Sequence, residues 1–190
     1  MTLDRPTLDP PTLVRATLLG LTTGSRSFSG LAAQVAVTPR LSWRQPERAL
    51  GHPWVKGLVA LLAAGELVGD KLPTAPSRLR PPVLVPRLVL AAVSALLVAR
   101  AEDQAGRALH EPAADGQGPA EAGLPPEPEA PAVPGSALLA VPLAVGASLT
   151  SAFLGSAWRS RATTLLGRDW PGAVLEDAVA LGLARVATRR

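Results

Sequence analysis

Apolar residues gather in five long stretches of the chain, and the longest uncharged one covers residues 135–158. A helix needs about 20 predominantly apolar residues to cross the hydrocarbon core of a bilayer. The other four stretches are 16–39, 54–72, 82–99 and 171–188, and 135–158 is expected to continue as a helix towards Gly167. Period-two alternation is absent, and the runs exceed the ~10 residues of a membrane strand. The pattern predicts an all-α, polytopic membrane helix bundle of about five transmembrane helices.

The chain divides into four parts on this basis. Residues 1–15 form a short exposed tail with three prolines and mixed charges, and 16–100 hold the first three membrane helices. Residues 101–134 contain seven acidic residues, one basic residue and seven prolines, a composition typical of a disordered linker. Residues 135–190 hold the last two membrane helices.

The basic residues lie beside the apolar stretches rather than in one block. The whole chain carries a net charge of +4 although its linker is strongly acidic. Lysine and arginine beside membrane spans are typical of integral membrane proteins, whereas nucleic-acid binding favours a clustered basic patch. The basic residues divide equally between the two sets of loops, so they define no orientation in the membrane.

All four tryptophans lie at or between the ends of the apolar stretches. They are Trp43, Trp54, Trp158 and Trp170. The indole ring is amphipathic and prefers the boundary between lipid and water, so we expect these residues to be interfacial anchors. A soluble bundle with unusually apolar helices is the alternative, and it would bury some of these rings in its core.

Five ionisable residues lie within or at the edges of the apolar stretches: Arg26, Glu66, Asp70, Glu176 and Asp177. A charge inside a span costs about 2.5 to 3.5 kcal/mol on insertion scales, so such residues are usually paired or functional. Glu66 and Asp70 are four residues apart and therefore share one helix face. We hypothesise a buried polar cluster in which Arg26 offsets one acid and another exchanges a proton. Alternatively, Asp70 marks a helix end, and Glu176 and Asp177 complement a helix dipole.

Two pairs of glycines, Gly20 with Gly24 and Gly65 with Gly69, have the spacing that allows close helix packing. The first two and last two apolar stretches also share an order, a small-residue helix followed by a helix with two acids. This order is compatible with two inverted helical-hairpin repeats, an arrangement found in transporters. Chance pairing of two hairpins explains the order equally well.

The residues give no indication of catalysis, a cofactor or a metal. The chain has no cysteine, and its two histidines fall outside the apolar stretches. It contains no G-x-S-x-G, no H-E-x-x-H and no phosphate-binding glycine loop. We therefore expect a protein that is not an enzyme.

Three strings, GSRSFSGLAA, GELVGDKLP and VLEDAVALG, resemble the bacterial integral membrane proteins grouped as the domain-of-unknown-function 4126 family. The resemblance covers most of the chain outside the tail and linker, and the acidic linker departs from it. It implies a multi-pass protein of the bacterial cytoplasmic membrane, with no established activity to carry over.

Two functions from different classes fit these features. The first is transport of a small solute, with or without protons, through the Arg/Glu/Asp cluster. The second is a non-catalytic membrane protein that organises partners or lipids, with the linker as a docking arm. The expected partners are the lipid bilayer and a second copy of the chain, with no nucleic acid.

Overall fold

The computed structural model describes residues 10–38, 47–69, 79–110, 133–167 and 170–189, and these residues are helical apart from short turns. The all-α prediction is therefore confirmed for this part of the chain. Its helices are α1 (Pro10–Ser25), α2 (Ser27–Val37), α3 (Glu47–Gly51), α4 (Pro53–Gly69), α5 (Pro81–His110), α6 (Ala137–Leu166) and α7 (Trp170–Thr188).

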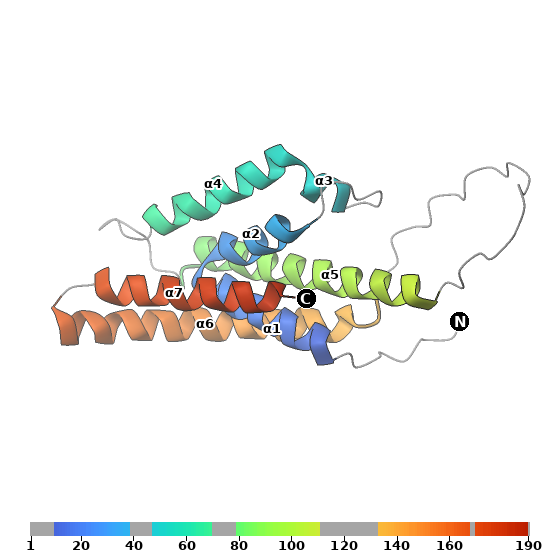
Figure 1. Cartoon of the computed structure of the whole chain (residues 1–190). Helices are drawn as coiled ribbons and strands as arrows, with labels where there is room; N and C mark the ends of the chain where they lie inside the picture. Colours follow the sequence, from blue (N-terminus) through green and yellow to red (C-terminus); the bar gives the residue numbers. More distant parts are fainter. Residues whose placement is uncertain (1–9, 39–46, 70–78, 111–132, 168–169, 190) are drawn as a thin grey trace, which may run out of the picture.

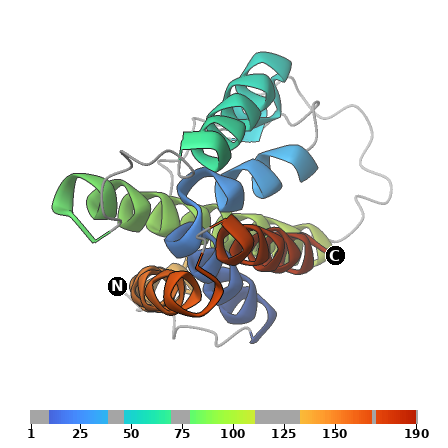
Figure 2. The same ribbon diagram turned by 90° about the vertical axis from the view of Figure 1, so that its left-hand side faces the viewer.

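The helices stack in tiers. Helix α1 packs against α5, α6 and α7, and α2 lies over them (Figure 1). Helix α4 is outermost, next to α2 and far from α6 (Figure 2). Helix α1 contacts α5, α6 and α7, which makes it the centre of the bundle.

The apolar stretch 16–39 does not form the single spanning helix that its composition predicts. The helix is interrupted at Arg26, whose backbone is extended (φ −141°, ψ 105°). Helices α1 and α2 diverge from this residue as a V-shaped hairpin (Figure 1). At 1.5 Å per residue the 16 residues of α1 and the 11 of α2 reach about 24 Å and 16 Å. Neither arm is as long as the ~30 Å hydrocarbon core is thick.

Helix α5 is longer than predicted and extends into the segment assigned to the linker. The linker was expected to begin at residue 101, yet α5 continues to His110. Residues 101–110, AEDQAGRALH, are mostly good helix formers, and this propensity outweighs their charge. The linker residues 111–132 lie outside the described part of the chain.

Helix α6 continues past Trp158, as predicted, and ends at Leu166. Gly167 follows it with φ 63°, and its N–H donates to the Thr163 carbonyl. This left-handed C-terminal cap favours glycine because a side chain is strained there.

The described helices bury small residues and expose large apolar ones. The buried positions of α5 and α6 are mainly alanine and serine: Ala91, Ser94, Ala95, Ala99, Ala137, Ala140, Ala144, Ser148 and Ala152. Leu138 is 68% exposed and Leu165 is 79% exposed. This distribution is the reverse of a water-soluble core and matches helices that pack through small residues and face lipid.

Two described segments are long and apolar enough to cross a membrane, Pro81–Gly106 in α5 and Ala137–Leu165 in α6. Helix α2 is apolar but shorter. The structure therefore supports two candidate spans, and the number five stays a prediction.

Helices α1 and α6 pack closely together through glycine. A Cβ added to Gly20 or Gly24 would overlap the backbone of Ala144 or Ser148, respectively. These glycines thus occupy the close approach that their spacing predicts. Gly65 and Gly69 differ, because nothing in the described structure lies within 4 Å of a Cβ added at either.

Candidate functional site

The helix interruption at Arg26 follows a run of residues with side-chain hydroxyls at the end of α1. Several hydroxyls in the last turns of α1 donate to backbone carbonyls: Thr22 to Leu18, Thr23 to Leu19, and Ser25 to Thr22. Such bonds compete with regular helical geometry and bend helices. Arg26 N–H still bonds to the Thr22 carbonyl at 2.7 Å, and α2 begins at the next residue.

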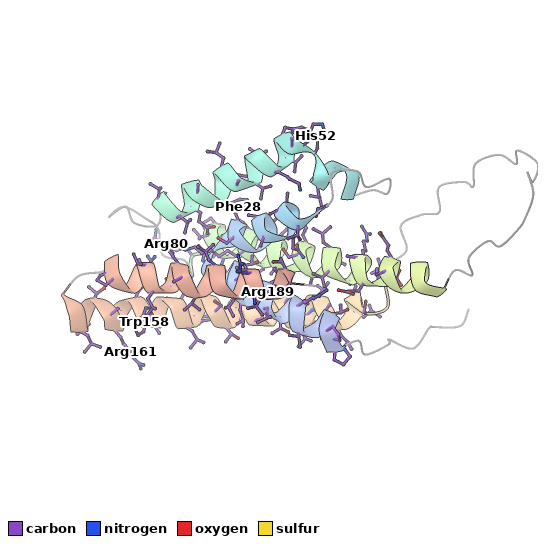
Figure 3. All side chains as sticks on the ribbon, viewed as in Figure 1. Phe28, His52, Arg80, Trp158, Arg161 and Arg189 are labelled. Carbon is purple, nitrogen blue, oxygen red and sulfur yellow. The ribbon has the colours of Figure 1, made fainter. Side chains whose placement is uncertain are left out.

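Glu66 of α4 caps the new helix start. Its two carboxylate oxygens accept the backbone N–H groups of Ser27 at 2.7 Å and Phe28 at 2.9 Å. These N–H groups have no partner within α2, and the amino end of a helix carries partial positive charge. The carboxylate therefore satisfies both donors and complements the dipole. Phe28 lies on the side of α2 next to α4 (Figure 3).

Arg87 of α5 binds the backbone carbonyls at the carboxyl end of α1, on the other side of the helix interruption. Its Nη1 donates to the carbonyls of Gly24 at 2.8 Å and Ser25 at 3.4 Å, the last residues of α1. Its Nη2 lies 3.4 Å from Oε1 of Glu66. A cation thus faces the negative end of α1, an anion faces the positive end of α2, and the two are paired.

Arg26 itself pairs with Asp177 of α7. The guanidinium is fully buried, the Asp177 side chain is 13% exposed, and Nη2 of Arg26 donates to Oδ1 of Asp177. We call Arg26, Glu66, Arg87 and Asp177 the breakpoint cluster. It holds two cations and two anions, so it carries no formal net charge, which lowers the cost of placing it inside a bundle.

The breakpoint cluster lies deep within the bundle. Gly24 is in contact with Ser148 of α6, 11 residues after the start of that helix at Ala137. This offset corresponds to about 16 Å along α6. If α6 spans a hydrocarbon core of ~30 Å, the helix interruption at Arg26 falls near the middle of that core.

The structure rearranges the predicted polar cluster of five residues. Arg26 and Asp177 meet, and Glu66 binds the residues that follow Arg26. Glu176 is also buried, and it pairs with Arg159 of α6 at 3.2 Å. Consecutive helical residues point about 100° apart, so Glu176 and Asp177 reach different partners. Asp70 lies outside the described residues.

Sequence reasoning missed two arginines of these networks. Arg87 is near the start of its apolar stretch and Arg159 follows Trp158, so both resemble flanking charges. One signal could have found Arg87, since it is the single charge between Pro82 and Ala99 and therefore needs a partner.

The predicted interfacial tryptophans have different surroundings. Trp54 is 64% exposed at the start of α4, and Trp158 on α6 lies next to α7, where its indole N–H donates to the Gly172 carbonyl at 3.3 Å (Figure 3). Trp170 is the first residue of α7. Trp43 lies outside the described residues.

The described part of the bundle contains two pockets of about 310 Å³ each. The hairpin cavity lies between the arms of the α1–α2 hairpin and is bordered by α3, α5 and α7. Its lining residues include Arg15, Leu19, Gln34, Thr38, Leu97, Ala101, Glu102 and Thr188. The lateral groove lies between α6, α7 and the end of α1. It reaches Ser25 and Glu176, the neighbours of Arg26 and Asp177.

The chain matches no protein-family model, no curated protein and no solved structure. The resemblance to the domain-of-unknown-function 4126 family therefore stays a prediction. Within the described ranges, no group of three or more histidine, aspartate or glutamate residues is placed to hold a metal ion.

Proposed function

We propose that this protein is a multi-pass integral membrane protein that conducts a small solute or a proton through the breakpoint cluster. The observation that carries the proposal is the broken α1–α2 helix, whose two internal ends are held by Glu66 and Arg87. Discontinuous helices in transporters place such ends near the middle of the bilayer, where substrates and ions bind.

The two pockets support the same proposal. The hairpin cavity lies between the arms of the V, and the lateral groove reaches Ser25 and Glu176 beside the breakpoint cluster. In the proposed path a solute moves from one to the other past the charged side chains of the breakpoint cluster. Glu66 is the natural switching group, because loss of its charge weakens both its bonds to α2 and its attraction to Arg87.

The membrane assignment has a direct test. We expect the full chain to remain with the membrane fraction after alkaline washing and to become monodisperse only with detergent or lipid. The physical reason is the exposed apolar surface of α4 and α6, where Leu61 and Leu138 are each 68% exposed. Light scattering in plain buffer is the measurement, and a monodisperse detergent-free species would contradict the assignment.

The transport proposal is tested by proton flux into proteoliposomes that contain a pH-sensitive dye. We expect the wild type to dissipate an imposed pH gradient faster than protein-free vesicles, alone or with a solute from a broad panel. Glu66→Gln should abolish this flux because a neutral amide cannot accept the proton or offset Arg87. Reconstituted variants are first checked for helical content and monodispersity.

Asp103→Asn is the matched control, because it also neutralises an acid but lies on α5 away from the breakpoint cluster. It should keep wild-type flux. Flux that survives in a folded Glu66→Gln protein, or wild-type vesicles as tight as empty ones for every solute, would rule out this transport role.

A further inference from the structure

The hairpin cavity contains a buried polar atom that no part of the described structure satisfies. Gln34 of α2 is 8% exposed and lines the cavity. Its Nε2 donates to the Ser94 carbonyl at 2.9 Å, whereas its Oε1 has no hydrogen-bond partner among the described residues. The orientation of the amide is fixed, because a carbonyl accepts hydrogen bonds and only the NH2 end can face it. The Oε1 atom of Gln34 is thus a buried acceptor available to a ligand.

The other polar groups of the cavity also offer acceptors. The Thr38 hydroxyl donates to the Gln34 carbonyl, and the Thr188 hydroxyl donates to the Ala184 carbonyl. Each has therefore used its single proton and keeps only lone pairs. At the rim, Arg15 donates to Glu102 and to the Arg189 carbonyl, so its positive charge is already offset.

The rest of the lining is apolar: Leu19, Val37, Leu50, Leu97, Val98, Ala101, Ala105 and Ala187. A volume of about 310 Å³ is at the lower limit of small-molecule sites, which typically combine apolar walls with a few orienting polar groups. We propose that the hairpin cavity binds a small, mainly apolar molecule that presents an N–H donor to Gln34. Binding there does not depend on whether the protein transports.

The proposal is tested by photolabelling the full chain in phosphatidylcholine nanodiscs. The probe is hexanamide carrying a diazirine, and the comparison probe is its N,N-dimethyl analogue, which keeps the carbonyl but lacks N–H donors. We expect the primary amide to label peptides from α1, α2 and the second half of α5 about tenfold more efficiently, the effect of about one net hydrogen bond. Mass spectrometry locates the label.

Two variants separate recognition from simple access. In Gln34→Met the two probes should label about equally, because the Oε1 acceptor of Gln34 is gone. Ala101→Phe leaves Gln34 in place but fills the cavity, and it should abolish labelling by both probes. Ala157→Phe on the exposed side of α6 is its control and should label like the wild type.

Equal labelling by the two probes in the wild type would overturn the proposal. So would labelling that persists in Ala101→Phe, or label confined to lipid-facing residues of α4 and α6. Because the readout is occupancy and not flux, a failure here leaves the proton-flux result standing, and the converse is also true.

Discussion

Replacement of Gly24 by valine is expected to separate α1 from α6 and to destabilise the protein by about 3 kcal/mol. A Cβ at this position would overlap the carbonyl group of Ser148, which is backbone and cannot rotate away. The two helices would have to move apart, and the contacts of Ala140 and Ala144 in the α1–α5–α6 core would be lost with them. Arg26 of the breakpoint cluster is only two residues from Gly24, so the geometry of the cluster would also change.

The measurement is unfolding by sodium dodecyl sulfate in lipid bicelles, followed by tryptophan fluorescence. Gly146→Val is the matched control, because it makes the same substitution on α6, where nothing lies within 4 Å of an added Cβ. We expect that variant to unfold close to the wild-type midpoint. If both variants unfold alike, the loss comes from valine in a helix and not from the α1–α6 contact.

Replacement of Arg26 by methionine is expected to destabilise the protein by about 3 to 5 kcal/mol, the usual cost of leaving one member of a buried ion pair without its partner. Arg26 is fully buried, and Asp177 would keep a charge with little access to solvent. Asp177→Leu should have a similar effect, because the arginine cannot readily lose its charge. Unfolding in bicelles again provides the measurement.

The double variant Arg26→Met, Asp177→Leu distinguishes pairing from packing. It removes both charges, so it should be more stable than either single variant. Arg185→Met is the control for loss of a cation from this region, because Arg185 lies on α7 but is exposed, and it should change stability by no more than about 0.5 kcal/mol. Additive losses in the double variant would show that Arg26 and Asp177 do not stabilise each other.

Helices α4, α5, α6 and α7 were predictable from the sequence because each contains a long apolar run. Helix α3 is too short to be predicted in this way, and α1 begins at Pro10, inside the segment predicted to be an exposed tail. The interruption at Arg26 was not predicted, since the residues on both sides of it are mostly small and carry no charge. Hydrophobic periodicity records which face is buried but not where one helix stops and another begins in a different direction. Hydroxyl groups at Thr22, Thr23 and Ser25 were the local hint.

The composition of the candidate site was predicted better than its pairing. Arg26, Glu66 and Asp177 were expected to be buried together, and the structure brings all three to the junction between α1 and α2. The partner of Arg26 could not be chosen from sequence, because Glu176 and Asp177 are adjacent and the rotation of α7 decides which partners each acid reaches. Glu66 was expected to join a cluster in which Arg26 offsets one acid, yet its carboxylate accepts the backbone N–H groups of Ser27 and Phe28, which no sequence pattern displays.

The inverted distribution of large and small side chains also predicts how this sequence tolerates variation. In a water-soluble protein, truncation of leucine is damaging and enlargement of a surface residue is harmless. Here Leu138 and Leu165 face outward, while Ala95, Ala140 and Ala144 form the packed interior. Evolutionary drift should therefore interchange leucine, valine and phenylalanine freely along the periphery, while a single extra methyl group at an interior alanine would be removed by selection.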